Sequence, residues 1–293
     1  MKMWYSVKVA GLRPNSAKVY RDIINAHLAP FFKSGLLSDV KPMHIKRLMA
    51  DKSNLSHSRQ AKILSTVSQV MESAVADGLV IKNPCAGIVA SGDRPKEKTP
   101  LTRQQQTEIV SAVKETRAEL FVLLCLYAGL RREEALGLMW SSVNVDCDTP
   151  YIEIKHTVSL GQSGLEHTEK LKSKAARRTI PVPAVLAEAL KRGRKNASSV
   201  FVVPAAHGGT LTESGVRRLW WIVQKNIGFY AHPHLLRHTY ITELCASGMD
   251  IKKIQYLAGH EDVTMTLRVY AHVRGNTPQE LSGDISRIFS GSK

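Results

Sequence analysis

The stretch that decides the fold is ELFVLLCLYAGLRREEALGL, residues 119–138. Its apolar run from Leu120 to Ala128 is the longest in the chain, but it is well short of the roughly 18–20 residues that span a bilayer. We therefore expect a buried helix that breaks at Gly129. Arg131 follows this break directly, and burying an arginine is costly unless an anion or a carboxylate meets it. Glu134 could be that carboxylate in a structural pair, and a bound anion is the alternative.

A small β region is predicted after this stretch. Residues 151–154 alternate with a period of two, and residues 178–182 form a second strand whose proline is typical of a sheet edge or a strand end. The segment between them, which contains Gly161, Gly164 and the three closely spaced lysines of residues 170–174, is predicted to form a hairpin. Residues 185–259 are again mostly helical in pattern. The expected fold class is mainly α with a small antiparallel β-sheet, that is, α+β.

The first 91 residues are predicted to form a separate helical domain. Apolar residues recur at helical spacing from residue 16 to residue 76. Pro14 precedes the first of these helices, Pro30 is expected to end it, and Asn83-Pro84 is expected to close the last one.

The second domain is expected to cover residues 102–293. Residues 92–101 are polar, charged and bracketed by prolines, as in an interdomain linker. A capping box, Thr102 with Gln105, then opens a new helix. A chain of 293 residues exceeds the usual size of a single core, which agrees with two domains.

The charge of the chain favours a polyanionic partner. Lys and Arg number 41 against 25 Asp and Glu, which gives a formal net charge of +16. Nucleic acid is the first candidate and an acidic membrane surface the second, whereas a merely soluble basic protein is the alternative. Residues 1–91 hold 13 of the basic and 5 of the acidic residues, so the smaller domain is the more densely basic. Such a domain is expected to grip phosphates without performing chemistry.

The sequence also predicts a compartment. The N-terminus lacks the apolar core of a signal peptide, and no segment is apolar enough to span a membrane. The four cysteines are far apart and form no CxxC pair, which is typical of reduced thiols. We therefore expect a cytoplasmic protein.

Four separated clusters contain the residues that could perform chemistry. They are Arg131 with its surroundings, the basic segment 170–178, the His234-Leu-Leu-Arg237-His238 stretch, and Gly259-His260 followed by Tyr270. Each has an ordinary alternative: a basic hairpin is usually a solvated loop, and a tyrosine at helical spacing is usually core. His234 and Arg237, three residues apart on a helix, share a face and can address one small anion.

Two other chemistries find little support. His232, His234 and His238 have a spacing that zinc could use, but Arg237 lies among them and the HExxH sequence is absent. There is no Walker A or GxGxxG sequence, which argues against nucleotide-driven chemistry.

The order of the four clusters is more specific than any one of them. Ala-Gly-Leu-Arg131, a hairpin lysine, His234-Leu-Leu-Arg237-His-Thr, Gly259-His260 and a tyrosine ten residues later together resemble the tyrosine recombinases. The resemblance covers residues 102–272 as a catalytic domain. It extends more loosely to residues 16–90, which look like the core-binding domain of that family.

The resemblance implies a role for each residue. Arg131 and Arg237 would hold the scissile phosphate, and Tyr270 would attack it to form a covalent 3′-phosphotyrosyl link. His234 and His260 would assist proton transfer. A hairpin lysine would protonate the leaving 5′-oxygen. Alignment on the Arg178-Thr-Ile-Pro181 stretch favours Lys172, and a slip in the hairpin would substitute Lys170 or Lys174. Because the covalent link conserves bond energy, no cofactor, ATP or metal is needed.

The implied partners are double-stranded DNA and three further copies of the chain, in a homo-tetramer on two DNA sites. Residues 277–290 are predicted to form a short helix that resembles the segment with which this family docks on the next subunit. The resemblance leaves room for accessory DNA-bending or directionality proteins. Many integrases of mobile elements carry an additional N-terminal domain. The residues that precede the core-binding helices in the given sequence are too few to form it.

The expected function is site-specific recombination for a mobile element. The alternatives are a recombinase that resolves chromosome or plasmid dimers, a type IB topoisomerase, and a DNA-binding protein with a disabled active site. The short predicted tail helix favours recombination over relaxation of supercoils, and the presence of every polar catalytic type argues against a disabled site. The target sequence of the DNA is not readable from the chain.

Overall fold

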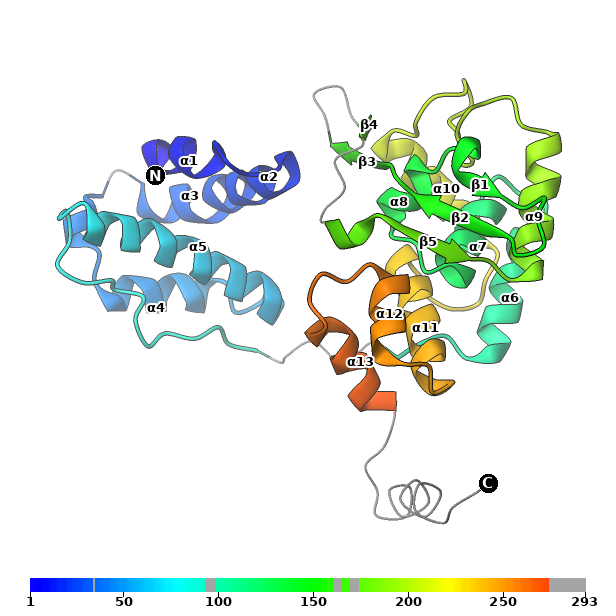
Figure 1. Ribbon diagram of the computed structural model, residues 1–293. Coiled ribbons are helices and arrows are strands. Elements are labelled where there is room, and N and C mark those ends of the chain that lie inside the picture. The colour runs from blue at the N-terminus through cyan, green and yellow to red at the C-terminus, as the bar shows by residue number, and fades with distance from the viewer. Residues whose placement is uncertain (34, 93–98, 161–164, 169–173, 274–293) are drawn as a thin grey trace, which may run out of the picture. The chain divides into compact units, whose positions relative to one another are not determined.

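The computed structural model describes all residues except 34, 93–98, 161–164, 169–173 and 274–293. The chain divides into two compact units, Met1–Glu97 and Lys98–Lys293, and each is described by itself (Figure 1). The predicted fold class is confirmed, because helices dominate and the strands form small antiparallel sheets.

The first unit is built from helices alone among its described residues. They are α1 (Lys2–Val9), α2 (Pro14–Ile23), α3 (Ala29–Phe32), α4 (Pro42–Asp51) and α5 (His57–Ala76), with a π-helical turn at Ile24–Leu28 and a 3-10 turn at Leu37–Asp39. The largest fully buried side chains are apolar and come from α2, the π turn, α4 and α5: Ile23, Leu28, Ile45, Leu48, Ile63 and Met71. The helical periodicity therefore identified most of the core-forming positions, with Val19, which is 39% exposed, as an exception.

Two helix boundaries in this unit differ from the prediction. Pro30 does not end a helix, because the π turn at Ile24–Leu28 widens the chain directly before it, where a proline ring would otherwise meet a carbonyl one turn back. The last helix, α5, ends at Ala76 rather than at Asn83-Pro84. Gly78 ends it, since its backbone has a φ of +70° and its N–H donates to the carbonyl of Val75 at 3.1 Å.

The second unit surrounds the apolar helix of the opening stretch. Its helices are α6 (Arg103–Val113), α7 (Glu119–Tyr127), α8 (Arg132–Gly137), α9 (Ala184–Lys195), α10 (Glu213–Lys225), α11 (Pro233–Ala246), α12 (Ile251–Ala258) and α13 (Thr264–Val273), with 3-10 turns at Trp140–Ser142 and Lys174–Ala176. Residues 121–126 of α7 are all buried, as predicted, and the predicted capping box at Thr102 and Gln105 opens α6.

The strands are β1 (Val143–Asn144), β2 (Tyr151–Ile154), β3 (Thr157–Leu160), β4 (Leu165–Thr168) and β5 (Arg178–Pro181). One antiparallel sheet has the order β1-β2-β5, and Tyr151 pairs with Pro181. Because β5 is an edge strand, the proline costs no ladder hydrogen bond inside the sheet, as predicted. The predicted hairpin is present as the pair β3–β4, in which Thr157 lies opposite Thr168.

Helices α11, α12 and α13 pack on one another, and α12 lies beside β5 (Figure 1). Four buried residues form a small apolar cluster between these helices: Ile241, Cys245, Ile254 and Ala258. The polar ends of α11 and α12 thereby lie close to α8, which the site described next requires. In the part of the chain that the structure describes, no helix is both long and apolar enough to cross a membrane.

Candidate active site

The break after α7 places Arg131 at the N-terminus of α8. Gly129 has a φ of +61°, and a Cβ atom there would lie 2.2 Å from Cδ1 of Tyr240, so the sharp turn requires glycine. Arg131 then caps α8: its backbone N–H donates to Oε2 of Glu134 at 2.9 Å, and its Nη1 donates to Oε1 at 2.6 Å. The Arg131–Glu134 pair that the sequence suggested is therefore present, and the Arg131 side chain remains 25% exposed.

The N-terminus of α11 supplies the next two side chains. His232 caps this helix by accepting the N–H of Leu235 on its Nδ1 at 3.1 Å, and a proline follows it in the first helical position. His234 is exposed, whereas Arg237, one turn later, is 2% exposed. The two lie on one side of α11, as their spacing predicts.

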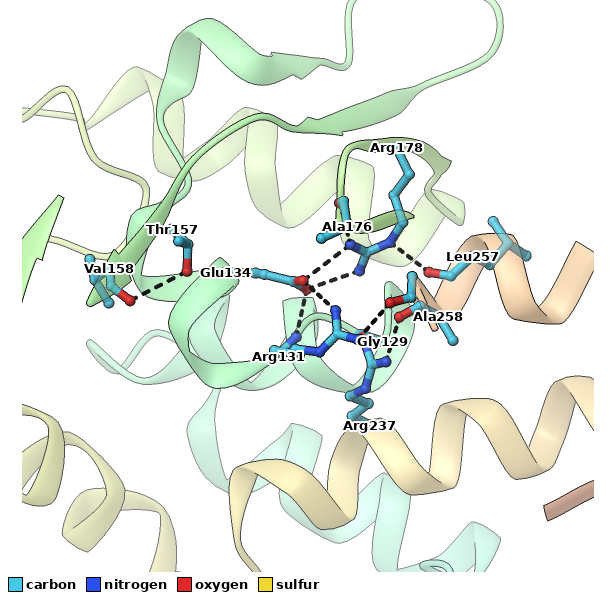
Figure 2. Close-up of polar contacts among 11 residues, drawn as sticks. Gly129, Arg131, Glu134, Thr157, Val158, Ala176, Arg178, Arg237, Leu257 and Ala258 are labelled. Carbon is cyan, nitrogen blue, oxygen red and sulfur yellow. Dashed lines mark hydrogen bonds and ion pairs between the residues drawn. The ribbon is translucent and has the colours of Figure 1, made fainter. Parts of the chain in front are cut away.

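The C-terminus of α12 collects three arginines on three successive carbonyls (Figure 2). Arg178 donates through Nε to the carbonyl of Leu257 at 2.8 Å, Arg237 donates to that of Ala258, and Arg131 donates through Nη2 to that of Gly259 at 2.6 Å. These carbonyls form the negative end of the helix dipole, which favours cations. The end of α12 therefore holds guanidinium groups in place.

Glu134 is the anionic centre of this group and is 3% exposed. It accepts hydrogen bonds from Arg131 on one side and from Arg178 on the other (Figure 2). Burial by itself would raise the pKa of this carboxyl, but the charge of Arg178, together with its hydrogen bonds and the charge of Arg131, lowers the pKa to about 2. Glu134 is therefore ionised at any physiological pH. Below, Arg131, Glu134, Arg178 and Arg237 are called the arginine–glutamate cluster.

Arg237 and His260 respond to burial in the same direction. Burial, and after it the charge of Arg131, lowers the pKa of the Arg237 guanidinium to about 9, so it remains charged at pH 7. His260 is 6% exposed, and its Nδ1 lies 2.9 Å from Oγ1 of Thr266. Burial, followed by the charges of Arg237 and Arg131, lowers the pKa of His260 to about 4. His260 is therefore a neutral imidazole at pH 7, able to donate or accept one proton.

A cavity of about 700 Å³ brings four of the predicted residues together: Arg131, His234, Arg237 and His260 all line it. Three acidic residues, Glu133, Glu261 and Asp262, also line it. The positive groups approach it from α8 and α11, and the imidazole of His260 approaches from the turn after α12. Such a concave site with two guanidiniums is suited to one phosphate group.

Two predicted residues are not among the described residues that line this cavity. Lys172 lies outside the described residues, as does Lys170, and of Lys174 only the backbone, at the start of a 3-10 turn, is described. Tyr270 lies on α13 and packs against the apolar cluster between α11, α12 and α13, and it is absent from the residues that line the cavity. The predicted nucleophile therefore does not line the cavity that contains the two guanidiniums.

Among the described residues, no group of three or more His, Cys, Asp or Glu side chains is arranged to hold a metal ion. His232, which the sequence offered as one of three possible ligands, serves as the cap of α11 instead.

Arg178 is the residue that sequence reasoning overlooked. It was used only to align the hairpin, yet its side chain is completely buried against Glu134. A signal existed: in β5, residues 178 and 180 are the buried positions of a strand with period two, so an arginine occupies an inward-facing position. A buried arginine requires an anionic partner, and the sequence analysis had already considered Glu134 for Arg131.

Comparison with known proteins agrees with this geometry. Residues 99–276 match the phage integrase family, and residues 1–52 match the phage integrase N-terminal SAM-like domain. A tyrosine recombinase XerC-like protein of Caldanaerobacter subterraneus subsp. tengcongensis is 29% identical over 68% of this chain and 58% of its own length. The chain thus spans less than two thirds of this relative.

Two solved structures share the fold. The Tn1549 transposon integrase in complex with transposon right end DNA superposes with a TM-score of 0.82 at 21% identity, over 97% of this chain and 98% of that one. A lambda integrase tetramer bound to a Holliday junction superposes with a TM-score of 0.72 at 17% identity, over 94% and 78% of the two chains. Given the match over residues 99–276, the chain belongs to the phage integrase family.

Proposed function

We propose that this chain is a site-specific DNA recombinase that cuts and rejoins DNA through a covalent 3′-phosphotyrosyl intermediate. The observation that carries the proposal is the cavity in which two guanidiniums and two imidazoles meet. Family membership supports the same reaction class. The similar structures with bound DNA support DNA as the substrate, and the net charge of +16 agrees with it.

Arg131 and Arg237 are proposed to bind the two non-bridging oxygens of the scissile phosphate. Negative charge grows on these oxygens as the phosphate is attacked, and a permanently charged planar group stabilises it best. Both guanidiniums are already oriented by backbone carbonyls, at Gly259 for Arg131 and at Gly129 and Ala258 for Arg237. Little reorganisation is therefore required when the phosphate binds.

Proton transfer is assigned to His234, His260 and Lys172. The neutral His260 can hydrogen-bond the phosphate or exchange a proton near it, because its low pKa keeps it uncharged at pH 7. Lys172 is proposed as the acid that protonates the leaving 5′-oxygen, on the resemblance alone. The attacking hydroxyl of Tyr270 must lose its proton during the reaction.

Tyr270 must approach the cavity before it can attack. In the structure its ring packs on the apolar cluster, so we propose that α13 shifts when DNA binds and brings the hydroxyl to the phosphate. This shift would separate the Tyr270 ring from the apolar cluster between α11, α12 and α13. The chain without DNA would thus hold its nucleophile apart from the phosphate site.

The assembly of the protein on DNA and its location in the cell are also proposals. The densely basic unit of residues 1–91 is proposed to clamp the duplex, with residues 92–101 as the linker. Four copies would act on two duplexes, in agreement with the lambda integrase tetramer on a Holliday junction. Residues 277–290 lie outside the described residues and are proposed to dock on the neighbouring copy. The protein is expected in the cytoplasm, bound to DNA.

The biological role is proposed to be integration and excision of a mobile element, in line with the similarity to a transposon integrase. Resolution of chromosome or plasmid dimers is the second candidate, because the XerC-like protein is among its relatives. Sequencing the DNA around the gene distinguishes the two: an adjoining attachment site or excision gene supports the mobile element.

The reaction is tested by trapping the covalent adduct. Duplex fragments from the DNA around the gene are incubated with the protein, and SDS-resistant adducts identify the cleaved site, from which a nicked suicide substrate is made. Tyr270→Phe should abolish the adduct and leave duplex binding nearly unchanged. Tyr256→Phe is the matched control, since it removes the hydroxyl of a half-exposed tyrosine outside the cavity, which accepts the backbone N–H of Thr179 at 3.0 Å. An adduct that persists in Tyr270→Phe would assign the nucleophile to another residue.

A further inference from the structure

The feature that the proposed mechanism does not use is the buried Arg178. In the arginine–glutamate cluster, Arg131 and Arg237 line the cavity, whereas Arg178 and Glu134 do not. Its side chain has 0% relative exposure. Burying a guanidinium completely is expensive, so its surroundings must supply both an anion and hydrogen-bond acceptors.

Arg178 is saturated by protein groups. Two hydrogen bonds of Arg178 go to the carboxylate of Glu134, from Nη1 to Oε1 at 3.1 Å and from Nη2 to Oε2 at 2.9 Å. The other two go to backbone carbonyls, from Nε to Leu257 and from Nη1 to Ala176, each at 2.8 Å. A guanidinium has five N–H groups, so at most one is left for any ligand. Arg178 is therefore no third phosphate ligand.

The bidentate pair fixes Glu134 from behind. The same two carboxylate oxygens accept the backbone N–H and Nη1 of Arg131, so Glu134 stands between the buried arginine and the one that lines the cavity (Figure 2). A bidentate contact defines the plane of the carboxylate as well as its position. The orientation of Arg131 therefore depends on Arg178 through the carboxylate of Glu134, which contacts both arginines.

The remaining bonds of Arg178 connect two other parts of the site. Leu257 belongs to the end of α12, two residues before Gly259, whose carbonyl holds Arg131. Gly259 also lies directly on the guanidinium: a Cβ atom at this position would be 2.8 Å from Nη1 of Arg178. Ala176 closes the 3-10 turn that follows the segment of the proposed catalytic lysine. One side chain thus joins the start of α8, the end of α12 and the return of the hairpin.

We propose that Arg178 is a positioning residue for strand cleavage, which acts through Glu134 to set the guanidinium of Arg131 against the scissile phosphate. This inference rests on the proposed function. A positioning role differs from a stabilising role, because loss of Arg178 would weaken the stabilisation that Arg131 gives to the negative charge of the transition state. Loss of this alignment is expected to slow cleavage about 100-fold, the usual effect of a displacement of about 1 Å at a reacting centre.

The test compares five variants on the nicked duplex described above, and Glu134→Gln alone is the reference for the double variant. Arg178→Met removes the charge and the bidentate contact, and Arg178→Lys keeps the charge without the fork. The double variant Arg178→Met/Glu134→Gln removes both charges of this buried pair. It therefore controls for the loss of stability that an unpaired buried charge would cause. Arg194→Met is the matched control, because Arg194 also donates to two backbone carbonyls, those of Trp140 and Val143, but lies outside the cavity.

A positioning role is distinguished from a stabilising role by the cleavage rate on a second substrate, which has a neutral methylphosphonate at the cleaved position. Because this substrate develops less charge, it depends less on Arg131. Arg178→Met should lose about 100-fold in cleavage rate on the phosphate substrate and clearly less on the methylphosphonate. Arg178→Lys should fall between Arg178→Met and the unmodified chain, and the double variant should cleave no more slowly than Glu134→Gln alone. Arg194→Met should cleave both substrates like the unmodified chain.

A second measurement does not require cleavage. With ¹³C-labelled glutamate, the Glu134 carboxyl should stay ionised well below pH 4 in the unmodified chain and take up its proton at a higher pH in Arg178→Met. Equal losses on both substrates, or an unchanged Glu134 titration, would reduce Arg178 to a stabilising residue. Failure of the unmodified chain to form any adduct would contradict the proposed function instead, while the titration would still decide the link between Arg178 and Glu134.

Discussion

The buried His260 predicts how the stability of the second unit depends on pH. Its pKa is about 4 in the folded chain, against about 6.5 for an unperturbed imidazole. Between these values the unfolded chain binds the proton and the folded chain does not, so the free energy of unfolding rises with pH through this window and levels off above it. The direction follows from burial and from the neighbouring Arg237 and Arg131, all of which disfavour the imidazolium.

The size of the effect follows from the two pKa values. At pH 5 almost all unfolded chains carry the proton on this histidine and almost no folded chains do, which costs about 2 kcal/mol relative to pH 7. His260→Gln removes this titration. The variant should therefore lose about 2 kcal/mol less than the unmodified chain between pH 7 and pH 5. Glu134, whose pKa is also lowered on folding, is present in both proteins, so its own titration cancels from this comparison.

Urea unfolding at the two pH values measures this difference. Trp4 is the only tryptophan in the first unit, so in a Trp4→Phe background the fluorescence of Trp140, Trp220 and Trp221 follows the second unit. His207→Gln, which removes an exposed imidazole, is the control and should keep the full loss of the unmodified chain. If His260→Gln loses as much stability as the unmodified chain, the imidazole is not held neutral by its surroundings and the reasoning is wrong.

Two further outcomes are expected. Gly137→Ala should destabilise the second unit by about 1–3 kcal/mol in urea unfolding, because the new Cβ would lie 2.6 Å from the backbone carbon of Thr157. Gly193→Ala should cost less, because its Cβ would meet side-chain atoms alone, Cδ1 of Leu120 at 2.7 Å and Cη2 of Trp140 at 3.2 Å. Equal losses would show that the backbone of β3 yields as easily as these side chains. Deletion of residues 277–293 should spare binding to duplex DNA and reduce the tetramer on DNA in light scattering, and an unchanged tetramer would leave this segment without a role in assembly.

Local sequence signals explain which parts of the fold were predictable. The apolar run of α7 predicts its own burial, because no other environment accommodates six consecutive apolar side chains, and Gly129 marks its end because only glycine adopts the turn beside Tyr240. The edge position of β5 followed from Pro181 for the same kind of local reason. The wrong boundaries, at Pro30 and at the end of α5, arose where a π turn and the Gly78 cap outweighed the more conspicuous prolines.

The sequence predicted the candidate site only as a set of residue types that follow one another in a particular order. Arg131, His234, Arg237 and His260 were named from the sequence, and the structure brings these four to one cavity. Tyr270 was named as well, yet nothing in its neighbourhood in the sequence indicates that its ring packs on the apolar cluster of α11 and α12. That contact depends on how three helices pack together.

The sequence by itself determined the chemistry of this protein: the residue types, their order and the helical and strand periods that bury each core. Only the tertiary structure decided how the charges are held. Glu134 and Arg178 are 44 positions apart, and Arg178 and Leu257 are 79 apart, so no local pattern could join them. They meet because a buried guanidinium must find an anion and carbonyl acceptors, and the folded chain supplies both at the end of α12. The resulting cluster explains why Arg131 points into the cavity, which its place in the sequence did not reveal.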